Sequence, residues 1–188
     1  MSLRETGQRY RRLALTVAAL AAAGLCAGCF QPMYGERSPF NGPGVSGKLA
    51  AINIIPIDTP NGTPMARIGV EVRNQLIFAL TGGAGGLPPA YDLKISLSGN
   101  RQQVIVDVQT ARPDVENYSI DASYSLIEIA TKRPVVQGRT FARVSYDIPG
   151  QQQRFASTRG LLDAENRAAA IIADHIKQRL ASYFVAGT

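Results

Sequence analysis

Residues 118–126 read Tyr-Ser-Ile-Asp-Ala-Ser-Tyr-Ser-Leu, with an apolar or aromatic side chain at every second position. This period of two predicts a strand with one buried and one polar face. The alternation changes phase at Ile127 and Ile129, which predicts a β-bulge near the end of the strand. The stretch therefore favours a sheet that packs one face on a core and leaves the other open.

Two further strands are predicted beside this stretch. Residues 91–108 alternate in two opposite phases, and Gly99-Asn100 between the two halves predicts a bulge or bend. Lys132-Arg-Pro134 predicts a turn into residues 136–146, where strand alternation resumes. Three strands in succession favour an antiparallel meander.

The meander is flanked by two amphipathic helical patterns. Thr63 and Pro64 are typical of an N-cap and a first helical position, and apolar residues recur every three or four positions over residues 65–79. Residues 157–184 carry a second stripe, and the Ile-rich residues 48–57 predict a strand before the first helix. The order β-α-β-β-β-α predicts an α+β two-layer sandwich. We expect a four-stranded, mainly antiparallel sheet with two helices packed on one face.

The first 28 residues have the composition of an export signal. Their charged residues are Arg4, Arg9, Arg11 and Arg12 against Glu5. An uncharged segment over residues 13–25 follows, which fits a signal peptide and is too short to cross a bilayer as a helix. The signal holds +3 of the net charge of +6, so the pI near 9.6 is poor evidence for nucleic-acid binding, and we expect no nucleic-acid partner.

Small residues, Ala27 and Gly28, precede Cys29 in the way they precede the lipid-accepting cysteine of a lipobox. We predict that residues 1–28 are removed as a lipoprotein signal peptide and that Cys29 is lipidated. Residues 29–47, rich in Pro and Gly, then form a flexible tether, and residues 48–188 form the folded domain. The alternatives are a disulfide between Cys26 and Cys29 or an uncleaved signal anchor.

The sequence contains no pattern that predicts catalysis, a metal site or a cofactor. The single histidine, His175, lies in the last helical stripe and favours a packing or surface role. Residues 82–89 are rich in glycine but lack the Lys-Ser/Thr ending of a phosphate loop, which favours an ordinary loop. The carboxylates of the predicted strands and turns do not have the paired spacing that would identify a glycosidase or a metal site. They are Asp92, Asp107, Asp114, Glu116 and Asp121. We therefore do not expect an enzyme.

The start of the predicted mature chain, Cys29-Phe-Gln-Pro-Met-Tyr-Gly35, resembles the lipopolysaccharide-assembly lipoprotein family LptE. The other matching segments are Arg73-Asn-Gln-Leu76, Tyr91-Asp-Leu93, Ala122-Ser-Tyr-Ser-Leu126, Gly138, Ala164-Glu-Asn-Arg167, Ile176 and Tyr183-Phe184. The resemblance covers nearly all of the mature domain. It implies a non-enzymatic lipoprotein that plugs the LptD β-barrel and assists lipopolysaccharide insertion into the outer leaflet.

The resemblance also implies a location and a ligand. Phe30 stands where an Asp would resemble an inner-membrane retention signal, which implies a lipid anchor on the periplasmic side of the outer membrane. Lipid A phosphates call for Arg and Lys donors. The candidate contacts are Lys94, Arg101, Arg139 and Arg143.

Two alternatives to this interpretation stay open. Arg139 and Arg143 are predicted on one strand face, with Arg101 near the same end, but these cations could equally belong to an ordinary solvated sheet face. The competing function is an auxiliary lipoprotein of an ABC-type lipid transport system, which would bind a transporter in place of a barrel.

Overall fold

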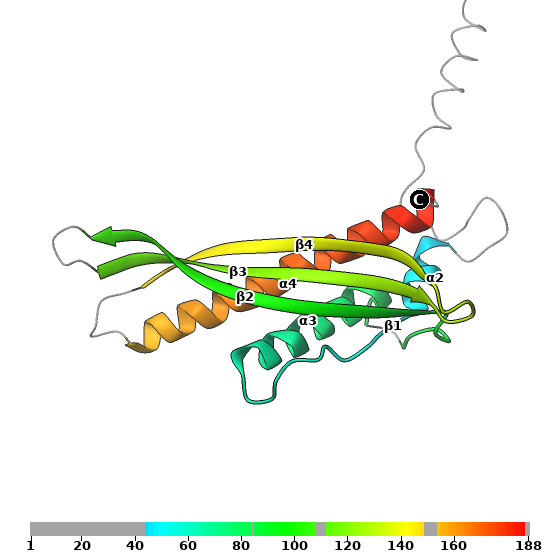
Figure 1. Cartoon of the computed structure of the whole chain (residues 1–188), viewed down its shortest axis with the longest axis horizontal. Helices are drawn as coiled ribbons and strands as arrows, with labels where there is room; N and C mark the ends of the chain where they lie inside the picture. Colours follow the sequence, from blue (N-terminus) through cyan, green and yellow to red (C-terminus); the bar gives the residue numbers. More distant parts are fainter. Residues whose placement is uncertain (1–43, 84, 108–111, 149–153, 187–188) are drawn as a thin grey trace, which may run out of the picture.

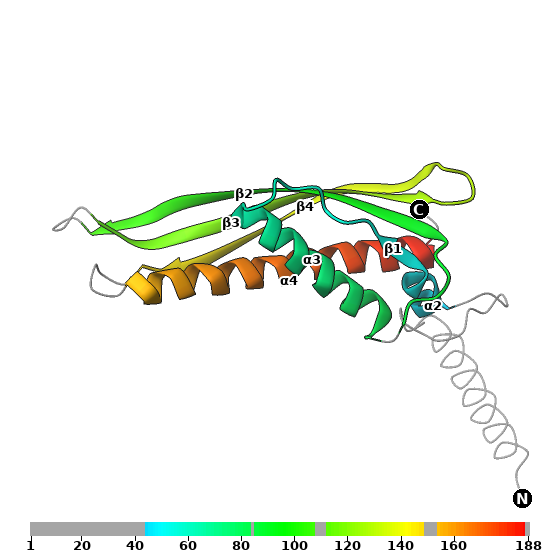
Figure 2. The same cartoon turned by 90° about the horizontal axis from the view of Figure 1, so that it is seen from below.

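The computed structural model describes residues 44–83, 85–107, 112–148 and 154–186. In chain order the elements are α2 (Val45–Ala50), β1 (Ile52–Ile54), α3 (Pro64–Thr81), β2 (Tyr91–Asp107), β3 (Arg112–Glu128), β4 (Pro134–Asp147) and α4 (Arg154–Ala186). The three long strands form an elongated, twisted sheet, and α3 and α4 cover one of its faces (Figures 1 and 2). The predicted α+β class, with a mainly antiparallel sheet, is confirmed.

The sheet has four strands in the order β1-β2-β3-β4. β3 runs antiparallel to both β2 and β4, as a meander with short turns requires. β1 runs parallel to β2 because α3 lies between them in the chain and carries it back to the start of the sheet. The sheet is therefore mixed only at its short first strand.

The core lies between the sheet and the two long helices. Every third or fourth residue of α4 from Ala164 to Leu180 is fully buried, and α3 contributes a matching stripe. The residues of these two stripes are Ile68, Val72, Leu76, Ala164, Ala168, Ile172, Ile176 and Leu180. Their period matches the predicted apolar faces, so hydrophobic burial orients both helices on the sheet.

The ends of α3 follow from individual residues. The Thr63 hydroxyl accepts a hydrogen bond from the backbone amide of Ala66, and Pro64 occupies the first turn, where no amide donor is needed. Gly82 ends the helix in the left-handed conformation at φ 66°. The predicted cap is confirmed.

The strand predicted over residues 48–57 is wrong over most of its length. Residues 45–50 form helix α2, and only Ile52–Ile54 pair with β2. Leu49 is 2% exposed, so burial of this side chain stabilises a helical turn that its glycine-containing neighbours disfavour. As a result, three residues of the predicted tether belong to α2.

One predicted bulge is confirmed and one is misplaced. The register of β3 with β4 shifts between Leu126 and Ile127, where the alternation changes phase. The register of β2 with β3 is continuous through Gly99 and is irregular only between Gln103 and Val106. Glycine at position 99 is explained by its neighbours, because a Cβ atom there would lie 2.5 Å from Met65 Cε and 2.9 Å from the Tyr118 hydroxyl.

Candidate ligand-binding face of the sheet

The sheet face opposite the helices is lined by polar side chains. Alternate residues of a strand point to opposite faces, so the positions between the core residues all lie on this side. The register aligns them in five rows across β2, β3 and β4. The rows are Lys94, Ser125 and Gln137; Ser96, Ser123 and Arg139; Ser98, Asp121 and Phe141; Asn100, Ser119 and Arg143; and Gln102, Asn117 and Ser145. We call these fifteen residues the open face.

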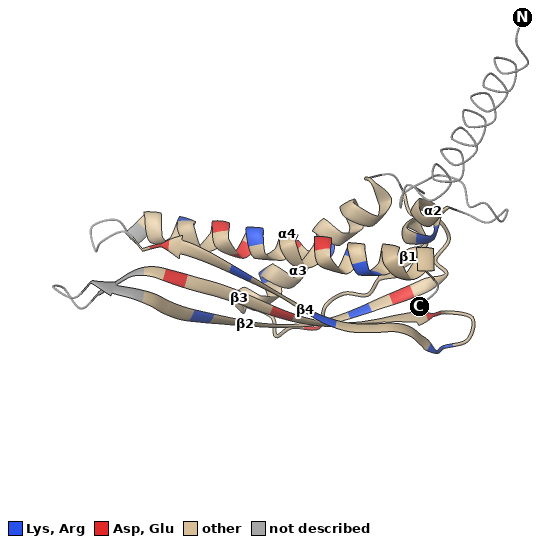
Figure 3. Cartoon of the chain, turned by 90° about the horizontal axis from the view of Figure 1, so that it is seen from above, with Lys and Arg blue, Asp and Glu red and all other residues tan. Residues whose placement is uncertain are grey.

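Within these five rows, Lys94, Arg139 and Arg143 outnumber one carboxylate, Asp121. Two further carboxylates, Asp92 and Asp147, lie on the same side at the ends of β2 and β4, so the positive charge belongs to the middle of the face. All three cations are exposed. Figure 3 shows Lys and Arg at separate positions along the strands, α2 and α4, and not gathered on one of these elements. The three cations of the open face are distinguished by sharing one surface that none of the described helices covers.

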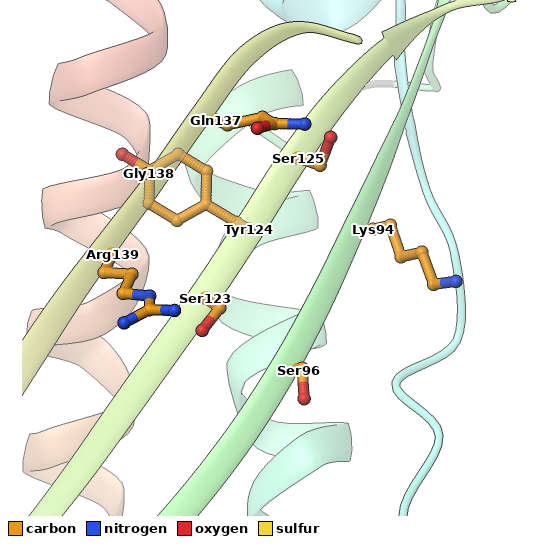
Figure 4. Close-up of a pocket in the computed structure, with 8 residues that line it drawn as sticks. All are labelled: Lys94, Ser96, Ser123, Tyr124, Ser125, Gln137, Gly138 and Arg139. Atoms are coloured by element: carbon orange, nitrogen blue, oxygen red, sulfur yellow. The ribbon is translucent and has the colours of Figure 1, made fainter.

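Lys94 and Arg139 border a hollow of about 460 Å³ on the open face. Figure 4 shows Lys94 on β2 and Arg139 on β4, with Ser123 and Ser125 on the strand between them. The two cations lie two strands and two residues apart, which places their backbones about 12 Å from each other. Short serine side chains leave the space between them unfilled.

The second half of the open face combines a cation with an aromatic ring. Arg143 Nε donates a hydrogen bond to Ser119 Oγ at 3.3 Å, which steadies its guanidinium above β3. Phe141 lies between Arg139 and Arg143 on the same side of β4 and is 65% exposed. The open face thus presents cationic donors, hydroxyl groups and one exposed ring.

Arg101 does not lie on the open face. It pairs with Tyr118, which is 4% exposed beneath the helices, and it lines a cleft with Arg67, Leu161 and Glu165. It lies at the same end of the sheet as Arg143, as expected, but on the opposite face. The misplaced bulge at Gly99 accounts for this, because the phase of β2 does not change before Arg101.

The cleft beside Arg101 contains buried polar groups that the sequence analysis did not identify. Arg67 on α3 forms an ion pair with Glu165 on α4, and it donates a second bond to Asn166 at 3.0 Å. Burial, followed by the nearby Glu165 carboxylate, raises the pKa of Tyr118 to about 12. The ion pair and the bond to Asn166 link α3 to α4. The period-two pattern of β3 was the only signal in the sequence for the burial of Tyr118 beside them.

Tyr146 on β4 makes a side-chain hydrogen bond to the neighbouring strand β3. Its hydroxyl donates a hydrogen bond to the carboxylate of Glu116. Burial and then this hydrogen bond raise the pKa of Tyr146 to about 12. Both buried tyrosines are therefore neutral at physiological pH, and the Tyr146 hydroxyl acts as a hydrogen-bond donor.

The described residues hold no cluster of three or more His, Cys, Asp or Glu side chains that could bind a metal ion. His175 is exposed, and its Nδ1 lies 2.9 Å from the Thr140 hydroxyl. Cys29, the predicted lipidation site, lies outside the described residues. In the described part of the chain, no helix combines the length and apolar character needed to cross a bilayer.

Comparison with known proteins identifies the family. The family model described as LptE, lipopolysaccharide-assembly, matches residues 49–180. A protein from Caulobacter crescentus CB15, whose structure is described as that of a lipoprotein, is 27% identical, with a TM-score of 0.58 over 77% of this chain and 97% of that chain. A minor lipoprotein from Acinetobacter baumannii has the same fold at 12% identity, with a TM-score of 0.51 over 71% of this chain and 92% of that chain. No curated protein sequence matches. The chain therefore belongs to the lipopolysaccharide-assembly family LptE, a family of non-enzymatic outer-membrane lipoproteins.

Proposed function

We propose that this protein is a lipid-anchored plug of an LptD-like outer-membrane β-barrel and that its open face contacts lipopolysaccharide during insertion into the outer leaflet. Family membership supports the barrel partner and the lipopolysaccharide cargo. The observation that carries the proposed contact is the gathering of Lys94, Arg139 and Arg143 on one polar sheet face, opposite the described helices α3 and α4.

The chemistry of the open face suits a phosphorylated sugar. Arg139 and Arg143 offer planar, bidentate donors to phosphate oxygens, and Lys94, whose backbone lies about 12 Å from that of Arg139, adds a compact charge at the other border of the hollow. The serine hydroxyls between them can donate hydrogen bonds to sugar hydroxyls or accept hydrogen bonds from them. A polar sheet face also suits the hydrated lumen of a large barrel.

Binding of purified lipopolysaccharide tests the contact. The variant Lys94→Gln/Arg139→Gln/Arg143→Gln is expected to bind about 10- to 100-fold more weakly, because each exposed charge contributes about 0.5–1 kcal/mol. Arg101→Gln, on the opposite sheet face, is the matched control and is expected to bind within about twofold of the unmodified protein. Unchanged binding by the triple variant would rule out the open face as the contact surface.

Affinity purification from detergent-solubilised outer membrane tests the partner. Stoichiometric recovery of a large β-barrel of the LptD type, identified by mass spectrometry, supports the plug. Recovery of inner-membrane transporter subunits instead would favour the auxiliary role in an ABC-type lipid transport system. Recovery of no partner would overturn the proposed plug.

The proposed anchor is a lipid on Cys29 that holds the domain on the periplasmic side of the outer membrane. Small residues before Cys29 and the Pro- and Gly-rich residues after it support this proposal. Several acyl chains, each CH₂ contributing about 0.8 kcal/mol on burial, give stable anchoring. The intact mass of the protein extracted from membranes tests for the acylated cysteine.

A further inference from the structure

One end of the elongated domain carries partly buried aromatic rings. Tyr91, at the start of β2, packs against Phe184 near the end of α4, with ring centroids 5.3 Å apart. Tyr183 packs against the same ring at 5.4 Å, and Lys48 Nζ of α2 lies 5.8 Å from its centroid. Figure 1 shows α2, the last turn of α4 and the start of β2 together at this end.

Two exposed apolar side chains extend this aromatic group. Val185 follows Phe184 and is 54% exposed. Leu87 is 50% exposed and is held beside α2, because its backbone amide donates to the carbonyl of Ala50 at 3.1 Å. We call Lys48, Leu87, Tyr91, Tyr183, Phe184 and Val185 the aromatic end.

Basic side chains outnumber acidic ones in the β3–β4 turn beside the aromatic end. The β3–β4 turn lies next to β2, because the Ile129 amide donates to the Ala90 carbonyl at 3.0 Å. This turn carries exposed Lys132 and Arg133, and Glu128 accepts a hydrogen bond from the nearby Thr131 hydroxyl. Aromatic rings with apolar neighbours and basic side chains match the boundary between phospholipid headgroups and acyl chains.

The length of the tether favours a membrane over other occupants. Residues 30–43 connect Cys29 to the first described residue, Gly44, and a Gly-rich chain of this length spans about 20–25 Å on average. α4 begins at Arg154 and ends at Ala186, so its first turn lies about 45–50 Å from the aromatic end. A lipid on Cys29 therefore keeps the aromatic end within about 20–25 Å of the bilayer, whereas the far end of α4 has no such restraint.

We infer that the aromatic end is a membrane-contact surface, which inserts Val185 and Leu87 at the phospholipid headgroup–acyl boundary. This inference rests on the proposed lipid anchor. It adds a second, domain-borne contact to the bilayer and would set the orientation of the domain relative to the membrane.

A single tryptophan can test this contact, because the chain has none. Val185→Trp reports on the aromatic end, and Phe155→Trp, at a position 89% exposed in the first turn of the same helix, is the matched control. The acylated mature protein is reconstituted in phosphatidylethanolamine–phosphatidylglycerol vesicles that contain brominated lipid. Fluorescence excited at 295 nm selects tryptophan over the tyrosines.

We expect brominated lipid to quench V185W at least about twofold more than F155W, with a blue-shifted emission, because bilayer insertion removes the indole from water. Equal quenching of the two variants in acylated protein would overturn the membrane contact and leave the anchor standing. An intact mass without acyl chains would overturn the anchor and, with it, the inference. The two failures are thus separated by one mass measurement on the same sample.

Discussion

Tyr124 and Gly138 form a cross-strand pair in which an aromatic ring fills the place of a missing side chain. A Cβ atom at Gly138 would lie 2.5 Å from the Tyr124 hydroxyl oxygen and 2.7 Å from its Cζ. Because Tyr124 is buried, Gly138→Ala must displace a packed ring and is expected to lower the free energy of unfolding by about 1–3 kcal/mol. Urea unfolding followed by circular dichroism measures this loss.

The matched control is Gly85→Ala, because no atom lies within 4 Å of the Cβ position at Gly85. This variant is expected to change the free energy of unfolding by less than about 0.5 kcal/mol. Equal losses in the two variants would show that the Tyr124 ring does not determine the need for glycine at position 138.

Tyr118 and Tyr146 make stability depend on pH in the alkaline range. Both have a pKa of about 12 in the folded protein, against an ordinary value of 10.0, so folding favours the protonated hydroxyl. Their contribution to stability is complete below pH 10 and is lost as the pH rises towards 12. We expect the urea midpoint to fall between pH 9.5 and 11.5, and to fall less in Tyr118→Phe/Tyr146→Phe. An equally steep fall in the double variant would contradict this assignment.

At the scale of elements, a buried carboxylate on α4 forms an ion pair with an arginine on α3. Glu165 is 5% exposed and pairs with Arg67, so Arg67→Met leaves a buried negative charge without its partner. We expect this variant to lose about 1–3 kcal/mol of unfolding free energy, which is less than for a fully buried pair because the Arg67 side chain is 41% exposed. Thermal and urea unfolding measure the loss.

The pair between Asp163 and Arg167 on α4 provides the control for this experiment. Its side chains are 66% and 51% exposed, so Arg167→Met leaves a solvated carboxylate and is expected to cost less than about 1 kcal/mol. If Arg167→Met were as destabilising as Arg67→Met, burial of Glu165 would not be the cause of the larger effect.

The sequence predicted those elements whose burial follows a simple period. α4 and α3 were predicted from apolar stripes, and the bulge after Leu126 from a change of phase in β3. α2 was missed because its six residues are too few for a helical period, and Leu49 acts through tertiary burial. Gly99 was interpreted as a bulge because the sequence does not show that Tyr118 occupies the space beside it.

Residues of the candidate site that share one strand were predictable from the sequence, and those that strand pairing brings together were not. Arg139 and Arg143 are four residues apart in one strand, so their shared face follows from the period of two. Lys94 joins them only through the cross-strand register, which the sequence does not reveal. The face of Arg101 could be predicted only with the bulge in β2 correctly placed. A bulge predicted too early in a strand reverses the sheet face predicted for the residues that follow it.

At the scale of the whole molecule, the folded domain and the predicted lipid anchor occupy separate parts of the sequence. The family match spans residues 49–180, and nearly all of the helix and sheet core lies within the same range, whereas Cys29 lies outside the described residues. Loss of the lipid should therefore change where the protein is found and should not change how it folds.

The variants Cys29→Ser and Cys26→Ser test this separation. Cys29→Ser removes the predicted acceptor of the acyl chains, so we expect the protein to leave the membrane fraction while its melting temperature, measured in the same detergent, stays within about 2 °C. Cys26→Ser, three residues earlier, keeps the acceptor and is expected to remain in the outer-membrane fraction. Release of both variants would favour a role for both cysteines, as in a disulfide. Retention of Cys29→Ser in the membrane would show that an uncleaved signal or the aromatic end holds the domain there without a lipid.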